Sequence, residues 1–145
     1  MTYEETLHYL YTSIPVFQHS GAAAYKPGLG TSIALDDYLG NPHKAYKTIH
    51  VAGTNGKGSV SHLLAAILRQ SGFKVGLYTS PHLVDFRERI RVNGKKISQD
   101  YVVDFVERHR SFFEPLHPSF FELTSSMAFE YFRDQQVDYA VIEVG

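Results

Sequence analysis

The sequence predicts an α/β fold in which helices flank a parallel sheet, and two observations carry this prediction. First, short β-branched or apolar segments alternate with amphipathic helical segments, which is the pattern of strand–helix–strand units. Second, a glycine-rich segment lies between the first predicted strand and the helix after it, where phosphate-binding loops occur. With 145 residues, of which 43% are hydrophobic, the chain is long enough to bury a core.

The N-terminal part is predicted to begin with a helix, because residues 3–14 place apolar side chains on one helical face before a proline. Residues 16–30 contain glycines and a proline and are predicted to form a loop. A short helix is expected over residues 31–39, where a glycine ends it. Residues 47–52, KTIHVA, are predicted to be a buried strand because of their β-branched content and their length.

The glycine-rich segment is followed by a helix, a strand and a hairpin. The helix is expected from Ser59, and its apolar stripe consists of Val60, Leu63, Leu64, Ile67 and Leu68. Residues 73–78, FKVGLY, are predicted to be the second strand. In residues 88–98, ERIRVNGKKIS, the Asn93-Gly94 pair between alternating apolar residues is the strongest short hairpin signal.

Two helices and a last strand complete the predicted order. Ser98 is a candidate N-cap for one helix, and Ser119 with Glu122 forms a capping box for the other. The last strand is predicted over residues 137–143. Helices between successive strands favour parallel pairing. Because an apolar strand is the last element and no covering element follows it, we expect the chain to be a truncated piece of a longer protein.

Composition excludes several classes of function. The chain has 14 basic and 15 acidic residues, so its net charge of −1 leaves no electrostatic footprint for nucleic acid or an anionic membrane. It has no cysteine and therefore no disulfide or thiolate chemistry. No apolar stretch approaches the roughly 20 residues that cross a bilayer, and the N-terminus does not resemble a secretory signal. We expect a cytoplasmic protein without an obligate protein partner.

Residues 53–59, GTNGKGS, are predicted to form a phosphate loop. Three glycines let the backbone curl and direct several N–H groups toward one point, and the following helix adds the positive end of its dipole. Lys57 adds a full charge, and Ser59 or Thr54 adds a hydroxyl. The strict pattern of glycine, four residues, then Gly-Lys-Ser/Thr is absent. The second Asn-Gly-Lys, residues 93–95, is interpreted as a hairpin turn that faces solvent.

The phosphate loop resembles that of the Mur ligase superfamily, and its Gly-Lys-Gly-Ser ending resembles the folylpolyglutamate synthase and dihydrofolate synthase branch. Three further stretches resemble this branch in the same order along the chain: YKPGLGTSIALDDYLGNP, GLYTSPHLVDFRERIRVNG and DYAVIEVG. The resemblance implies a fold of the Mur ligase central-domain type. It also implies that residues 1–145 are an incomplete N-terminal ATP-binding domain, with a C-terminal glutamate-ligase domain absent from this chain.

The activity that this resemblance implies is an ATP-dependent ligase that forms an amide through an acyl phosphate. It would add L-glutamate to dihydropteroate, to folylglutamate, or to both, with ATP and Mg²⁺ as cofactors. Contacts to ATP are implied for Gly53, Thr54, Asn55, Gly56, Lys57, Gly58 and Ser59. Lys57 is the candidate catalytic residue, because it stabilises charge on the transferring phosphoryl group. We expect nucleotide binding, and no ligase turnover, from these 145 residues alone.

The resemblance implies further roles outside the phosphate loop. Ser80 and Glu143 are implied as magnesium ligands, although a Ser-Pro turn and an ordinary polar strand end are the structural alternatives. His82 and Arg89 are implied to border the folate site, and both residue types are commonly just solvated. Phe121 is implied to pack on the pterin ring, with a core phenylalanine as the alternative. The eight histidines show no ligand spacing and predict no metal site of their own.

Three other functions remain open from the sequence. A GTPase-type switch would share the phosphate loop, but the chain has no Asn-Lys-x-Asp guanine signature. The second function is that of a nucleotide-binding module without ligase activity, or of a domain that keeps the loop as a structural turn. The third is another amino-acid ligase of the Mur type, against which the TSPHL and ERIRV stretches argue by resemblance.

Overall fold

The computed structural model describes residues 1–14, 29–53 and 55–144. Most of the predicted loop 16–30, together with Thr54, lies outside these residues. The chain divides into two units, of which the first consists of Met1–Asn41 and Gln99–Met127, and the second of Pro42–Ser98 and Ala128–Gly145. Within the described ranges, no helix combines the length and the apolar character that crossing a membrane requires.

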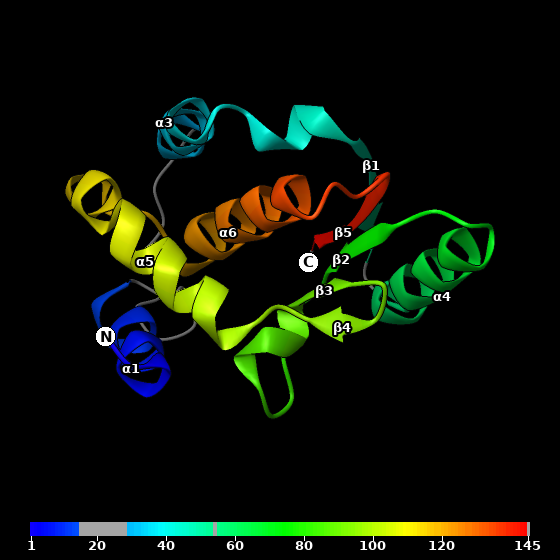
Figure 1. Ribbon diagram of the computed structural model, residues 1–145, viewed down its shortest axis with the longest axis horizontal. Helices are drawn as coiled ribbons and strands as arrows, with labels where there is room; N and C mark the ends of the chain where they lie inside the picture. The colour runs from blue at the N-terminus through cyan, green and yellow to red at the C-terminus, as the bar shows by residue number, and fades with distance from the viewer. Residues whose placement is uncertain (15–28, 54, 145) are drawn as a thin grey trace. The chain divides into compact units, whose positions relative to one another are not determined.

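The first unit is helical. Its elements are α1 (Tyr3–Ser13), α3 (Gly30–Leu39), α5 (Gln99–Phe113), the short 3-10 helix η4 (Glu114–Leu116) and the first half of α6 (Phe120–Asp134), all labelled or traceable in Figure 1. The predicted capping box starts α6: Glu122 N–H donates to Ser119 Oγ at 3.0 Å, and Ser119 N–H donates to Glu122 Oε1 at 2.8 Å. Gly40 ends α3 at φ 83°, as its glycine predicts.

The second unit contains the sheet. Its elements are η2 (Pro42–Ala45), β1 (Lys47–Ala52), α4 (Lys57–Gln70), β2 (Val75–Tyr78), η3 (Phe86–Arg89), β3 (Ile90–Val92), β4 (Lys95–Lys96), the end of α6 and β5 (Tyr139–Val144). The strand order is β1-β5-β2-β3-β4. Pairing is parallel between β1 and β5 and between β5 and β2, which confirms the predicted α/β core, whereas β3 and β4 extend the sheet by antiparallel pairing.

The antiparallel extension is the predicted hairpin. Asn93 and Gly94 connect β3 to β4 and have φ values of 49° and 81°, as a two-residue turn with the twist of the strands requires. Ile90, Val92 and Ile97 on either side of the turn are buried. The turn also contacts the neighbouring strand β2, because Asn93 Oδ1 accepts a hydrogen bond of 2.9 Å from Val75 N–H.

Helices cover both faces of the parallel strands in this unit. On one face, Val75, Leu77 and Val141 form a buried cluster with the partly buried Leu64, Ala65 and Leu68 of α4. On the other face, the strand residue between Val75 and Leu77 is Gly76, and the ring of Phe132 from α6 lies against it. In β2, alternation along the strand therefore directs successive residues to α4 and to α6 in turn.

One prediction about burial is wrong, and one predicted apolar stripe is only partly covered. Residues 47–52 are not a buried strand, because β1 lies at the edge of the described sheet and only Val51 among its six residues is buried. The apolar stripe predicted for α4 is also only partly buried. Leu64 and Leu68 pack on the sheet, whereas Val60, Leu63 and Ile67 are 48%, 62% and 52% exposed. β-branched content indicates a strand but does not indicate how many neighbours the strand has.

Candidate functional site

Three predicted site segments meet at one edge of the sheet. The phosphate loop follows β1, Ser80 follows β2 by two residues, and Glu143 lies near the end of β5. The strand register pairs Ala52 with Val144 and Tyr78 with Ile142, so the three carboxyl ends are level. In open α/β sheets, the edge outside the carboxyl ends of parallel strands is where ligands bind.

The backbone of the phosphate loop depends on glycine at two positions. Gly53 has a φ of 151° and Gly56 a φ of 71°, and side chains other than glycine rarely adopt either value. Gly56 is the N-cap of α4, and no side chain caps the helix there. The first amides of α4 therefore stay available to a ligand, and the helix dipole favours a negative one. Asn55 and Ser59, the other predicted contact residues of the loop, are exposed.

Lys57 bends back over this loop. Its Nζ donates a hydrogen bond of 3.3 Å to the Gly53 carbonyl oxygen, which bridges the first and fifth residues of the loop. The bond is exposed, and the ammonium retains donors for an additional acceptor. The loop thus combines a cation with the uncapped first amides of α4, and this combination suits a phosphate group.

Glu143 is the most unusual group at this edge. Its side chain is 4% exposed, and the described residues provide it with no hydrogen bond or ion pair. A Cβ atom built on Gly58 would lie 3.9 Å from Glu143 Oε2, so the carboxylate faces the first turn of α4. A cation between this carboxylate and a phosphate on the loop would have oxygen ligands on both sides.

Ser80 provides a second oxygen at the same edge and is half-buried. A hard divalent cation takes oxygen ligands, and magnesium usually binds one or two protein groups while phosphates and water complete its shell. The described chain contains no cluster of three or more histidine, cysteine or acidic side chains. The donor set of Glu143 and Ser80 therefore fits magnesium bound together with a nucleotide better than a metal held by protein alone.

The structure brings His82 and Arg89 together. Arg89 Nε donates a hydrogen bond of 2.7 Å to His82 Nδ1, which makes Nδ1 the acceptor and assigns the ring proton to Nε2. Burial, and then the charge of Arg89, lowers the pKa of His82, so the ring is held neutral. Whether the pair borders a substrate site stays a prediction.

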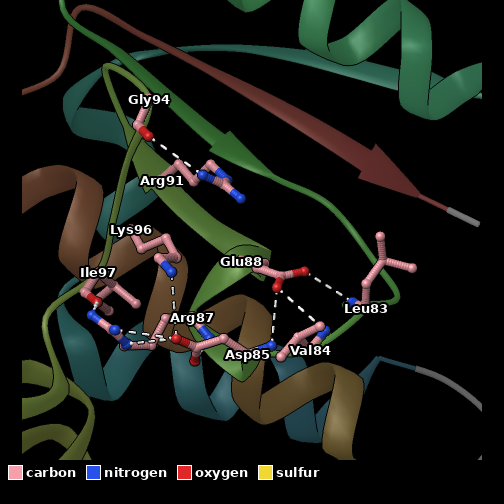
Figure 2. A network of polar contacts seen from close by, with 9 residues as sticks. All are labelled: Leu83, Val84, Asp85, Arg87, Glu88, Arg91, Gly94, Lys96 and Ile97. Carbon is pink, nitrogen blue, oxygen red and sulfur yellow. Dashed lines mark hydrogen bonds and ion pairs between the residues drawn. The ribbon is translucent and has the colours of Figure 1, made fainter.

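Sequence reasoning missed Glu88, which holds the segment between Ser80 and η3. Its carboxylate accepts hydrogen bonds from the backbone N–H groups of Leu83 at 2.9 Å, Val84 at 3.3 Å and Asp85 at 3.0 Å, as Figure 2 shows. The Asp-x-x-Glu spacing of Asp85 and Glu88 is a capping-box signal that could have revealed it. Leu83 and Val84 are 91% and 88% exposed at the tip of this segment.

These backbone bonds predict an acid-dependent loop. The hydrogen bond from Leu83, followed by the one from Asp85, lowers the pKa of Glu88 below its ordinary value of 4.5. The stabilising contribution of Glu88 is therefore present above pH 4.5 and is lost as the pH falls through the lowered pKa. The amide resonance of Leu83, followed by NMR against pH, should titrate with a midpoint below 4.5.

Glu88→Gln is expected to remove this titration of Leu83, and Glu114→Gln, in the other unit, should leave it unchanged. A wild-type midpoint at or above 4.5 would contradict the assignment of Glu88.

The remaining predicted residue, Phe121, belongs to the first unit. It lies in the first turn of α6 and is 46% exposed, so it is not a core phenylalanine. An exposed ring is compatible with contact to an aromatic ligand, and that contact stays a prediction.

Comparisons with known proteins agree with this geometry. No protein-family model matches the chain. It is 39% identical over 127 residues to the dihydrofolate synthase/folylpolyglutamate synthase of Bacillus subtilis, which covers 83% of this chain and 30% of that protein. The solved folylpolyglutamate synthase of Thermotoga maritima is 46% identical, with a TM-score of 0.86 over 99% of this chain and 33% of its own.

A third similar structure is a folylpolyglutamate synthase complex with AMPPCP and folate. It is 36% identical, with a TM-score of 0.84, and the match covers 100% of this chain and 35% of that one. The chain thus spans about a third of the length of these relatives.

Proposed function

Because this chain belongs to the family of folylpolyglutamate and dihydrofolate synthases, we propose that it carries the ATP-binding part of a ligase that adds L-glutamate to dihydropteroate, to folylglutamate, or to both. The observation that carries the proposal is the largely buried Glu143 carboxylate, which faces Gly58 in the first turn of α4 beside a phosphate loop. A similar protein has been solved in complex with AMPPCP, which supports a nucleoside triphosphate as the ligand at the carboxyl ends of the parallel strands.

The proposed reaction makes an amide from a carboxylate, which is a poor electrophile. A carboxylate oxygen of the folate substrate attacks the γ-phosphorus of ATP, ADP leaves, and an acyl phosphate forms. The amine of L-glutamate then attacks the acyl carbon and loses a proton, and inorganic phosphate leaves with the bonding pair. Each of the two steps has a good leaving group, which direct condensation lacks.

Residues of this chain would act on the first step. The amides at the start of α4 bind the phosphate oxygens, and Lys57 stabilises the charge that develops on the transferring phosphoryl group. To do so, Lys57 exchanges its 3.3 Å bond with Gly53 for phosphate oxygens. Glu143 and Ser80 would hold Mg²⁺, which supplies neutralisation of the phosphate charges when bound.

Residues 1–145 would supply only part of the enzyme. We propose that they form an incomplete N-terminal ATP-binding domain, and that the glutamate site and the remaining catalytic groups come from a C-terminal domain. The relatives are about three times as long as the matched region, which is consistent with this division. Cytoplasmic location and the contacts of His82, Arg89 and Phe121 with a folate remain predictions.

The test is titration calorimetry of MgATP into the chain and into Lys57→Ala. We expect saturable binding by the wild type and an affinity about 10- to 100-fold lower in the variant, since a charge-assisted hydrogen bond contributes about 1.5–3 kcal/mol. Lys44→Ala removes an exposed lysine of η2 and should bind as the wild type does.

Two outcomes would contradict the proposal. Equal affinity of the wild type and Lys57→Ala would assign the loop a purely structural role. Preference for GTP over ATP in competition would favour a GTPase-type protein.

A further inference from the structure

We propose a second anion site in this chain, a cavity that binds a small oxyanion between α4 and the β3–β4 hairpin. The cavity has a volume of about 210 Å³ and lies entirely within the second unit. Its polar lining includes Arg69 and His62 from α4 and Arg91 and Asn93 from the hairpin, above an apolar floor of Val75, Leu77, Ala65 and Ala66. Pockets for drug-sized ligands measure about 300–1,000 Å³, so this volume suits a phosphate- or carboxylate-sized group.

Two guanidinium groups converge in this cavity on the same residue. Arg91 Nη1 donates a hydrogen bond of 3.4 Å to the Gly94 carbonyl oxygen, as Figure 2 shows. A Cβ atom built on Gly94 would lie 2.9 Å from Arg69 Nη1, so the second guanidinium also lies against this turn. Two positive charges beside one turn repel each other, and an anion bound between them would offset this repulsion.

Within the described part of the chain, neither arginine has an ion-pair partner. Among the described residues, none of the recorded ion pairs involves Arg69 or Arg91, and no acidic residue lines the cavity. Glu88 is close enough for the charge of Arg91 to lower its pKa, but its oxygens accept bonds from three backbone amides. Arg69 lies in the last turn of α4, where the helix dipole favours a positive charge. Arg91 lies on β3, so the helix dipole does not explain its charge.

Arg91 also has an unmet hydrogen-bond donor. Its Nε is the only side-chain nitrogen or oxygen in the described residues that is buried and has no hydrogen-bond partner. Buried donors in folded proteins normally have a partner, so this donor is an exception at the base of the Arg91 guanidinium. A planar guanidinium binds an oxyanion through paired N–H groups, so phosphate or carboxylate matches the donors that Arg91 and Arg69 present.

The site is separate from the phosphate loop, because none of its lining residues belongs to residues 53–59. Besides connecting β3 to β4, the turn Asn93-Gly94 lines the proposed anion site together with Arg69 and Arg91.

The experiment uses NMR on the ¹⁵N-labelled 145-residue chain with Lys57→Ala, which weakens phosphate binding at the loop. Sodium phosphate and sodium glutamate are titrated separately at constant ionic strength and pH. We expect saturable shifts of the Asn93 and Gly94 amides with at least one anion. The anion that binds more tightly identifies the ligand as phosphate-like or carboxylate-like.

Adding Arg69→Gln should weaken this binding about tenfold or more, because the anion loses charge-assisted hydrogen bonds from the Arg69 guanidinium. Because Arg69 is exposed, the substitution should not disturb the fold. Lys95→Gln is the matched control: it removes the same charge beside the turn from a side chain outside the cavity, and it should change the affinity less than twofold. Arg91→Lys is a further variant, which keeps the charge but loses the planar donor pair and should also weaken binding.

Absence of saturable shifts with both anions would overturn the proposal. Equal weakening by Arg69→Gln and Lys95→Gln would also overturn it, since that result indicates general attraction to a basic surface.

Discussion

Replacing Glu143 with glutamine is expected to abolish the magnesium dependence of ATP binding and, at the same time, to raise the stability of the chain without ligand. Glutamine keeps the shape of the side chain but removes the charge that would hold a cation. In calorimetric titrations, the affinity for MgATP should fall about 10- to 100-fold, the size of loss typical when a metal loses its supporting groups. ATP without magnesium should bind the variant and the wild type equally.

The stability gain follows from the burial of Glu143. The wild-type side chain is 4% exposed and no described residue forms an ion pair with it, so folding removes most of the side chain from water with no opposite charge beside it. An uncharged amide costs less to bury, and we expect a gain of about 0.5–2 kcal/mol in the free energy of unfolding, as is common when a functional group is neutralised. Urea denaturation at neutral pH measures this change.

Glu130→Gln serves as the control for this pair of effects. Glu130 is 2% exposed but makes interactions within the described chain, so its replacement should lower stability and leave the magnesium effect intact. If Glu143→Gln bound MgATP as the wild type does, Glu143 would not be a metal ligand.

The second large effect concerns Gly76 in the middle of β2. An added Cβ atom would lie 2.6–2.8 Å from three ring atoms of Phe132, which is fully buried. Neither partner has room to yield, because the ring cannot swing toward solvent and the strand is paired on both sides. Gly76→Ala is therefore expected to lower the free energy of unfolding by about 1–3 kcal/mol, the usual cost of overpacking a core. Urea denaturation measures this cost.

A double-mutant cycle separates overpacking from loss of backbone freedom. Phe132→Leu makes room at the ring, so the double variant Gly76→Ala/Phe132→Leu should be more stable than the sum of the single effects predicts. Gly30→Ala is the control, since an added Cβ there meets nothing within 4 Å and should change stability by less than about 0.5 kcal/mol. A Gly76→Ala variant as stable as the wild type would show that the β2–α6 packing is wrong.

Local signals in the sequence predicted much of this structure. The capping box of Ser119 and Glu122, the Asn93-Gly94 turn and the strand–loop–helix order around the phosphate loop all depend on residues a few positions apart. Each appears where it was expected, because neighbouring residues satisfy its hydrogen bonds or its special φ angles. The predicted and observed ends of elements differ by up to two residues; α4, for example, begins at Lys57 rather than at Ser59.

Burial was harder to predict than element type. The composition of residues 47–52 suits a central strand, yet β1 has one strand neighbour among the described residues and exposes most of its side chains. The α4 stripe follows a correct helical period, but the sheet beneath it covers only part of its width. Periodicity records which residues share a face, whereas the packing partner decides how much of that face is covered.

By itself, the sequence determined the α/β order, the glycine-dependent loop at residues 53–59 and the turn at Asn93-Gly94, because each is encoded by adjacent residues. Only the tertiary structure decided which distant groups meet. The register of β5 turns Glu143 toward Gly58, and the hairpin brings Arg91 to the same residue that Arg69 approaches from α4. Such meetings depend on strand register and on which face each side chain occupies, and a shift of one residue in either strand would separate them.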